Sequence, residues 1–346
     1  MSGHNVHLIG SVPLRDAAAV FETVSAALGP QLKRIPDGET GARLDWITWL
    51  EPVFSKNPLF ETAETFRLHE TAPARQRYRM KPGISAKDVR LDNLFYADIA
   101  RESYATFKRL RDDGKIPPGT KFQVDLVPAH SVLWLYVTER QQMELDPVYN
   151  EAVIREIDKL TKSIPHKDLA IQFDVASAVF ARLERKEANP YGRSKEETQA
   201  HFTAIIAKLA NLVLHDIDLL FHFCYGDSNH RHVVEPTDMG DMVDMANALT
   251  RAISRPIQLI HMPVPRNRFD DAYFAPLTRL ALRPETELCL GLVHYTDGLE
   301  GTRRRMATAR KYTKNFSIAT ECGLGRRPPE TIPELLRIHA EIAAMD

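Results

Sequence analysis

Residues 219–227 read LLFHFCYGD, an apolar run that closes on a histidine, a cysteine and a turn. Branched and aromatic residues in a short run bounded by turn residues are typical of a buried β-strand. Because strand side chains alternate between two faces, His222 and Cys224 point to the same side. Gly226 and Asp227 supply the turn that follows. The stretch therefore predicts a strand that presents two soft side chains on one face, near its carboxyl end.

Similar runs surround this one and give the chain its predicted architecture. The eight runs cover residues 6–11, 32–39, 121–128, 169–176, 218–226, 256–264, 287–295 and 315–323. Amphipathic stretches with apolar residues at three- and four-residue spacing separate them. The clearest are 92–114, 153–164, 196–216, 236–254, 302–313 and 328–345. Eight strands alternating with helices predict an α/β fold, a single parallel (β/α)8 TIM barrel that spans residues 1–346 as one domain.

Two features refine this architecture. Residues 45–90 match neither a strand nor a helix period, so we interpret them as an insertion after the second strand that covers one end of the barrel. The competing architecture is an open, doubly wound sheet. That fold would carry a GxGxxG loop after an early strand, and the sequence has none.

Composition excludes several classes of function. The chain has 346 residues, 44% of them hydrophobic, and a formal net charge of −1, so no basic field favours nucleic acid or an anionic membrane. No apolar run approaches the ~18 residues that span a bilayer. The N-terminus lacks a signal-peptide pattern, and we expect a cytoplasmic protein. Three widely spaced cysteines favour thiol or metal chemistry over a disulfide framework.

Cys322 is a third candidate metal ligand beside the His222–Cys224 pair. It ends the eighth run, and the carboxyl ends of barrel strands open at one face, where active sites lie. Imidazole and thiolate bind zinc at about 2.0–2.3 Å, and catalytic zinc sites combine three protein ligands with an open fourth position. For the His222–Cys224 pair alone, two packed interior side chains are the competing interpretation. Cys289 lies within its run, and we assign it to packing.

The motifs around these residues resemble a known family. HFCYGD and ECGLGR are similar to the segments that close the fifth and eighth strands of the cobalamin-independent methionine synthase barrel. That superfamily includes uroporphyrinogen decarboxylase and the zinc methyltransferases of coenzyme M metabolism. IGSVPLRD, IPDGETGARLDW and IQFDVA also resemble its segments, so the similarity runs from about residue 8 to 340. The resemblance implies Zn²⁺ as cofactor, with His222, Cys224 and Cys322 as ligands and Ser11 near the substrate.

The sequence departs from the methionine synthases at two positions. Those enzymes bring a glutamate to zinc from the sixth strand, where this chain has His261. His261 is then a fourth ligand, or the metal relies on three protein ligands as in the coenzyme M enzymes. The acidic residue that follows Asp174 in the synthases is Val175 here. That segment helps bind their amino acid substrate, so the acceptor is expected to differ from homocysteine.

Other polar residues are placed near the same face of the barrel. Asp37, Glu39 and Arg43 follow the second strand, and either position a polar substrate or form a salt-bridged turn.

Four more residues end later strands. Asp174 ends the fourth and is expected to contact substrate or support the ligands. Tyr225 is a candidate substrate contact, and Asp227 a candidate acceptor for the imidazole of a ligand. His294 ends the seventh strand and is a further catalytic candidate.

The predicted chemistry is alkyl transfer to a thiol. Two thiolates and one imidazole leave bound Zn²⁺ without net charge, which favours a nucleophilic sulfur over an acidic water. The expected partners are a small-molecule thiol and an alkyl donor, either a small electrophile or the corrinoid of a partner protein. The alternatives are a zinc-dependent hydrolase or carbon–carbon lyase on the same barrel, and a non-catalytic metal or ligand carrier with a closed site. The identities of thiol and donor, and the oligomeric state, do not follow from the sequence.

Overall fold

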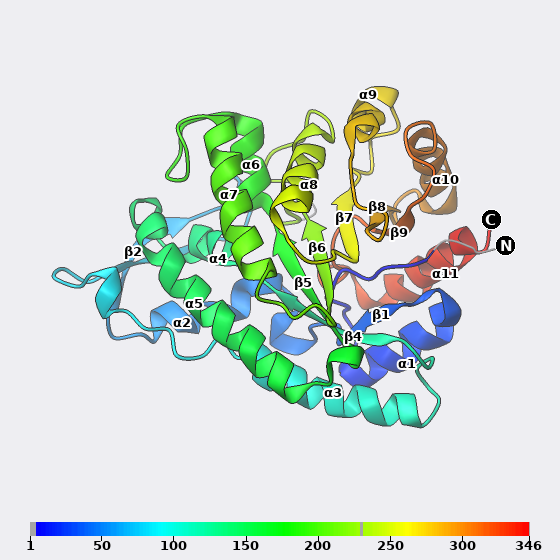
Figure 1. The fold of residues 1–346 in the computed structure, drawn as a ribbon, viewed down its shortest axis with the longest axis horizontal. Coiled ribbons are helices and arrows are strands. Elements are labelled where there is room, and N and C mark those ends of the chain that lie inside the picture. The colour runs from blue at the N-terminus through cyan, green and yellow to red at the C-terminus, as the bar shows by residue number, and fades with distance from the viewer. Residues whose placement is uncertain (1–4, 229–230, 346) are drawn as a thin grey trace.

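A parallel sheet forms the centre of the computed structural model, which describes residues 5–228 and 231–345 (Figure 1). Its seven strands lie in the order β1-β4-β5-β6-β7-β8-β9, so consecutive strands are neighbours throughout. They are β1 (Arg34–Pro36), β4 (Lys121–Leu126), β5 (Leu169–Val175), β6 (Asp218–Phe223), β7 (Leu259–Pro263), β8 (Glu287–Val293) and β9 (Ser317–Thr320). Seven of the eight predicted strands are therefore confirmed.

Helices connect these strands and cover the outside of the sheet (Figure 1). The helices are α1 (Ala17–Leu28), α2 (Pro52–Ser55), α3 (Tyr96–Asp112), α4 (Ala129–Tyr136), α5 (Glu139–Ser163), α6 (Ser177–Arg185), α7 (Lys195–Ala210), α8 (Gly240–Ala252), α9 (Asp271–Phe274), α10 (Gly298–Ala309) and α11 (Ile332–Ala343). All six predicted helices are among them. Within the described ranges, no helix combines the length and apolar composition that crossing a membrane requires.

The first predicted strand, residues 6–11, is not a regular strand. Val6 makes isolated parallel bridges to Leu32, beside β1, and to Ile318 in β9, so the two edges of the sheet approach each other here. Farther along, the Leu8 and Ile9 carbonyls accept hydrogen bonds from the Gln123 side-chain amide at 3.1 and 3.2 Å. At Leu8 and Ile9, hydrogen bonds from side chains thus take the place of a backbone ladder between strands. The curled sheet is compatible with a TIM-like barrel.

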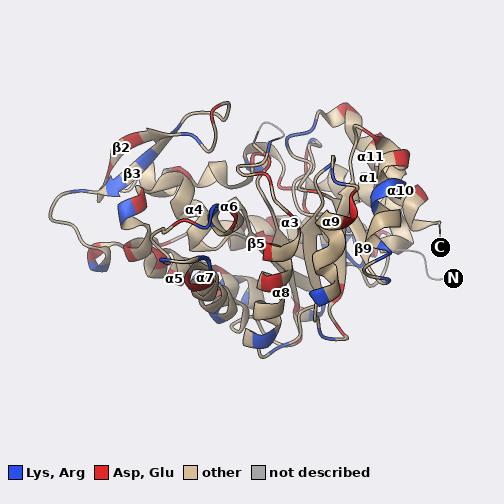
Figure 2. Ribbon diagram, turned by 90° about the horizontal axis from the view of Figure 1, so that it is seen from above, with Lys and Arg blue, Asp and Glu red and all other residues tan. Residues whose placement is uncertain are grey.

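The segment between β1 and β4 contains a separate antiparallel hairpin of β2 (Phe60–Phe66) and β3 (Arg75–Met80). Opposite charges face each other across it, with Arg79 bound to Glu61 and Arg77 to Glu64, at 2.8 and 3.3 Å. Figure 2 shows both signs of charge on these strands. No strand was predicted from the sequence in this segment. The hairpin was missed because cross-strand ion pairs support it, and such pairs leave no hydrophobic period in the sequence.

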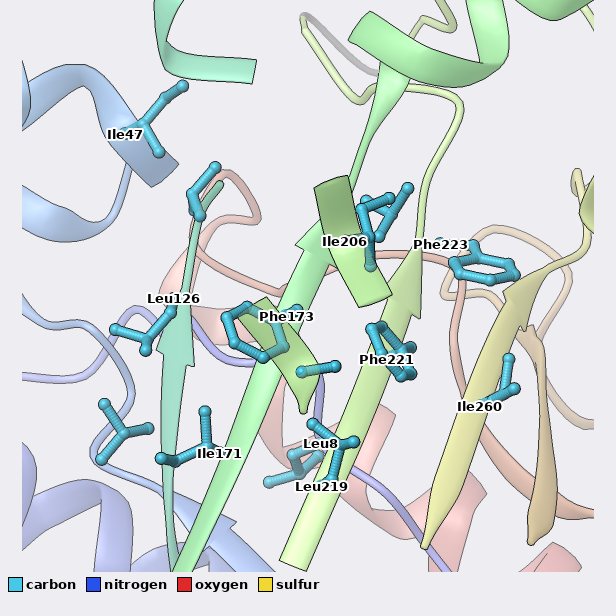
Figure 3. Close-up of a cluster of buried hydrophobic side chains, with 14 of the residues drawn as sticks. Leu8, Ile47, Leu126, Ile171, Phe173, Ile206, Leu219, Phe221, Phe223 and Ile260 are labelled. Atoms are coloured by element: carbon cyan, nitrogen blue, oxygen red, sulfur yellow. The ribbon is translucent and has the colours of Figure 1, made fainter. Parts of the chain in front are cut away.

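The two faces of the central sheet have different roles. Outward residues such as Phe173 and Phe221, whose rings lie 6.1 Å apart, pack beneath helices, with Ile206 of α7 nearby (Figure 3). The inner face begins with a small apolar cluster that includes Cys289, so the packing role predicted for this cysteine is confirmed. Toward the carboxyl ends of the strands, inner positions become polar. This layer holds the candidate site.

Candidate metal centre

His222, Cys224 and Cys322 converge at the carboxyl ends of β6 and β9. His222 lies in β6, Cys224 directly follows it, and Cys322 follows β9 by two residues. The two sulfur atoms are 3.6 Å apart, and Cys322 Sγ lies 3.9 Å from His222 Nε2. All three donor atoms lie within 4.8 Å of one another. Among the described residues, this is the group of histidine, cysteine and acidic side chains that could hold a metal ion.

The spacing of these donor atoms fits zinc. Tetrahedral bonds of about 2.3 Å to sulfur and 2.0–2.1 Å to nitrogen place two sulfurs about 3.8 Å apart and sulfur about 3.6 Å from nitrogen. The two thiols share a proton, because the hydrogen bond from Cys224 lowers the pKa of Cys322 to about 5. The same contact raises the pKa of Cys224. One member of the pair is therefore a thiolate at neutral pH.

His261 lies behind His222, on β7, and outside the group of three donor atoms. Its Nε2 is 3.1 Å from the Thr320 carbonyl, which can only accept, so this nitrogen carries the proton. Burial lowers the pKa of His261 well below its usual value and keeps the ring neutral. Its Nδ1 must then accept from His222 Nδ1, at 2.9 Å. These two hydrogen bonds leave the lone pair of His222 on Nε2, the nitrogen that faces Cys322.

The three donors line one cavity. Its wall includes Ser11, Glu39, Asp174, Asp227 and Arg326, together with the ring of Trp46. Ser11 accepts a hydrogen bond from Gly325 N at 3.1 Å. A Cβ on Gly323 would lie 2.5 Å from Ser11 Oγ, so this glycine permits a close approach of the two segments. The predicted substrate residues Ser11, Glu39 and Asp174 thus share one cavity with the ligands.

Buried carboxyl groups form one side of this cavity. Asp174 accepts hydrogen bonds from Trp46 Nε1 at 3.0 Å and Gln172 Nε2 at 3.0 Å. Burial, with the nearby Asp174 carboxylate, raises the pKa of Glu39 to about 8. Burial also raises the pKa of Asp125. Glu39 is therefore largely protonated at neutral pH, and this side carries less negative charge than its residue types imply.

Asp37 and Arg43 do not line the metal cavity. Asp37 accepts from Arg43 and from Ser103 at 2.7 Å each, and from the backbone N–H of Glu39 at 2.8 Å. With Glu39, they line a smaller adjoining cavity. Of the two interpretations left open for this turn, a buried salt bridge describes Asp37 and Arg43. Glu39 alone reaches the metal cavity.

The remaining predicted residues lie around the site. Tyr225 is buried beside Phe180 and Tyr273, and it does not line the metal cavity. Asp227 does line it, but the acceptor expected from Asp227 for His222 comes from His261 instead. His294 bonds the Val264 carbonyl at 2.8 Å and lines a neighbouring polar groove, which Asp227 also borders.

Trp46 and Arg326 are among the residues of the cavity wall that sequence reasoning missed. Trp46 adopts a left-handed backbone (φ 53°), an uncommon conformation for a bulky residue that is often found at functional sites. Arg326 lies four residues beyond Cys322 and lines the cavity. Both stand inside motifs that carry the family resemblance, LDW and CGLGR, which was the available signal.

Solved structures with the same fold were found by comparison. A B12-independent methionine synthase from Shewanella sp. W3-18-1, in complex with selenomethionine, matches with a TM-score of 0.64 and 12% identity over 99% of this chain and 97% of that chain. The chain shares the fold of that synthase. A candidate vitamin-B12-independent methionine synthase from Listeria monocytogenes matches with a TM-score of 0.55 and 13% identity, covering 99% and 98% of the two chains. A methyltransferase from Methanosarcina mazei gives 0.53 and 11%, covering 99% and 95%.

These matches confirm the predicted resemblance at the level of fold. No protein-family model matches the sequence, and no curated protein matches it.

Proposed function

We propose that this protein transfers an alkyl group, such as methyl, to the sulfur of a small thiol, with Zn²⁺ held by His222, Cys224 and Cys322. The observation that carries the proposal is the convergence of one imidazole and two thiols, within 4.8 Å of one another, on the wall of a cavity. Methyltransferases and methionine synthases of the same fold support alkyl transfer as the reaction class.

The chain's own residues prepare this site for a thiol. Bound Zn²⁺ would supply the Lewis acidity that favours the thiolate form of a substrate at neutral pH. His261 holds the Nε2 lone pair of His222 toward the cavity. Trp46, Ile9 and Leu68 give the cavity an apolar part that limits water near the sulfur. Asp174 fixes the indole of Trp46 and, with Ser11 and Glu39, offers polar contacts to the substrate.

Three protein ligands leave a position for an exchangeable one, which distinguishes a catalytic site from a carrier with a closed site. A carrier protein would close the site with a fourth protein ligand, and a hydrolase would retain water in the presence of a thiol. The alkyl donor is a small electrophile or a corrinoid on a partner protein. Asp227 and His294 border the groove next to the cavity, and we place the approach of the donor there.

Substitution of the cysteines tests the proposal. Cys224→Ser and Cys322→Ser should each abolish stoichiometric zinc and alkyl transfer together, because each removes one of three ligands. Cys289→Ser is the matched control, since Cys289 packs in the inner cluster, and it should keep full metal content. Zinc is measured by elemental analysis. Activity that persists undiminished after chelation would show that the metal is not required.

A thiol titration separates the rival functions. In the cobalt-substituted protein, an added thiol should strengthen the sulfur-to-cobalt absorption bands as a third sulfur joins the metal. A spectrum that no thiol changes, across a panel of low-molecular-weight thiols, would instead favour a hydrolase or a carrier.

A further inference from the structure

Phe95 is the most exposed large apolar side chain in the described part of the chain, at 50%. Its neighbours Leu94 and Tyr96 are buried, so of the three only Phe95 points outward, where α3 begins. The Phe95 backbone is left-handed (φ 65°), an uncommon conformation for a bulky residue. The Asn93 side chain supports this conformation, because its oxygen accepts the Phe95 N–H at 2.9 Å. The local structure therefore directs one aromatic ring into solvent.

Phe95 borders an open groove on the surface of the protein, and the lining of this groove is largely apolar. Residues 49–59 and 88–95 supply the lining. The apolar side chains of the lining that reach the surface are those of Trp49, Pro52, Val53, Pro58, Leu59 and Phe95. Contiguous apolar surface with polar residues at its margin is typical of a contact with another protein.

The two segments of the groove contribute opposite charges to its lining. The segment 49–59 contributes one cation, Lys56. The segment 88–95 contributes one net negative charge, from Asp88, Arg90 and Asp92. A two-fold rotation that seats the segment 88–95 of one copy against the segment 49–59 of another brings these opposite charges together, twice. The groove is therefore complementary to itself in charge.

We infer that this groove is the contact between two copies of the chain, related by a two-fold axis, and that Phe95 of each copy enters the groove of the other. In a two-fold contact the same surface faces itself, so protrusion and groove must lie side by side on it, as they do here. An aromatic ring that fills a pocket of a partner is the kind of residue that dominates association. The inference does not depend on the proposed function.

The contact would also support the metal cavity from outside. The short 3-10 helix Trp46–Leu50 presents Trp46 to the metal cavity and Trp49 to the groove. The Trp49 ring packs edge-on against Tyr96, the residue after Phe95, at 5.2 Å between ring centres. A second copy that covers Trp49 would therefore restrain the segment that supplies part of the cavity wall.

Sedimentation equilibrium of the full chain tests for this contact over low to high micromolar concentrations. The wild type should shift from the mass of one chain toward the mass of two. Phe95→Asn should raise the dissociation constant at least about 30-fold, the effect of removing one dominant aromatic residue. Asparagine tolerates the left-handed backbone, so the fold should be retained.

Leu212→Asn is the matched control, because Leu212 is 45% exposed and lies outside the groove lining. It should associate as the wild type does. A wild type that stays monomeric at every concentration, or a Phe95→Asn variant that associates equally well, would overturn the inference.

A mixture of two variants tests the geometry of the contact. Pro52→Asp places a charge in the groove at an exposed position and should weaken association as Phe95→Asn does. In a mixed pair, the Phe95 ring of the Pro52→Asp chain meets the unchanged groove of the Phe95→Asn chain, so one of the two contacts is kept. The mixture should therefore associate more tightly than either variant alone. Variants that associate no better when mixed would show that Phe95 does not enter this groove, and would refute the inference.

Discussion

At His222, the direction of one hydrogen bond decides whether the ring can bind a metal. A neutral imidazole has one protonated and one free nitrogen, and only the free nitrogen can be a ligand. The Thr320 carbonyl keeps the proton of His261 on Nε2, and His261 in turn keeps the proton of His222 on Nδ1. His261, which the sequence analysis offered as a fourth ligand, thus lies behind His222 and supports it. A side chain that fixes a ligand's tautomer commonly contributes 10- to 100-fold to metal affinity.

His261→Leu should therefore weaken zinc binding by about 10- to 100-fold while the fold is retained. His261→Gln should restore part of the affinity, because its amide oxygen can accept the Nδ1–H of His222. Affinity is measured by chelator competition, and ¹⁵N shifts of His222 report which nitrogen is protonated. If the leucine variant binds zinc as tightly as the wild type, the hydrogen-bond chain has no role in ligation.

The candidate metal ligands are also the residues that sequence reasoning places best. Strand alternation puts His222 and Cys224 on one face, and parallel topology brings Cys322 to the same end. Trp46 and Arg326 could not be assigned this way. They reach the cavity from irregular segments, where no period relates sequence position to side-chain direction.

Among the elements of the fold, the first segment is a case in which the hydrophobic pattern does not predict the hydrogen bonding. Residues 6–11 have the composition of a strand, yet the Leu8 and Ile9 carbonyls bond to the side chains of Gln123 and Gln172. A hydrophobic pattern cannot reveal that an amide on another strand occupies the ladder position. The β2–β3 hairpin is the converse case, an element with regular pairing and no apolar period.

Gln123→Leu should destabilise the protein by about 1–3 kcal/mol, because it leaves the buried Leu8 carbonyl without a donor, whereas the Ile9 carbonyl keeps the one from Gln172. Gln123 is 2% exposed. Urea unfolding measures the change. Gln76→Leu, the same substitution at an exposed position of the hairpin, should stay within about 0.5 kcal/mol. Similar losses for both variants would mean that the side-chain amide is not what holds the first segment.

For the whole molecule, buried neutral histidines link stability to pH. His339 in α11 is fully buried, with Nδ1 2.7 Å from the Leu335 carbonyl and Nε2 without a partner among the described residues. Burial lowers its pKa to about 4, against 6.5 for the exposed group. His130 of α4 packs against Phe202 of α7, and burial lowers its pKa to about 3. The folded protein thus excludes protons that the unfolded chain binds.

The sign of the effect follows from that difference. Above pH 6.5 neither state binds the proton at His339, so the folded state has its full stability. Between pH 6.5 and 4 the unfolded chain is protonated first, and the free energy of unfolding falls by about 1.4 kcal/mol per pH unit, about 3 kcal/mol in total for this residue. His339→Leu removes the titrating group, so its free energy of unfolding should fall less steeply across this window.

Urea unfolding at pH 7 and pH 5 measures the slope, and a second histidine supplies the control. The partly exposed His166 has its pKa raised by a hydrogen bond to Asp216. Its contribution is present below the ordinary histidine pKa and is lost as the pH rises, so His166→Gln should not reduce acid sensitivity. If His339→Leu loses stability on acidification as steeply as the wild type, burial of this imidazole does not govern the fall in the free energy of unfolding at acidic pH. Protonation of carboxylates in ion pairs would then account for that fall.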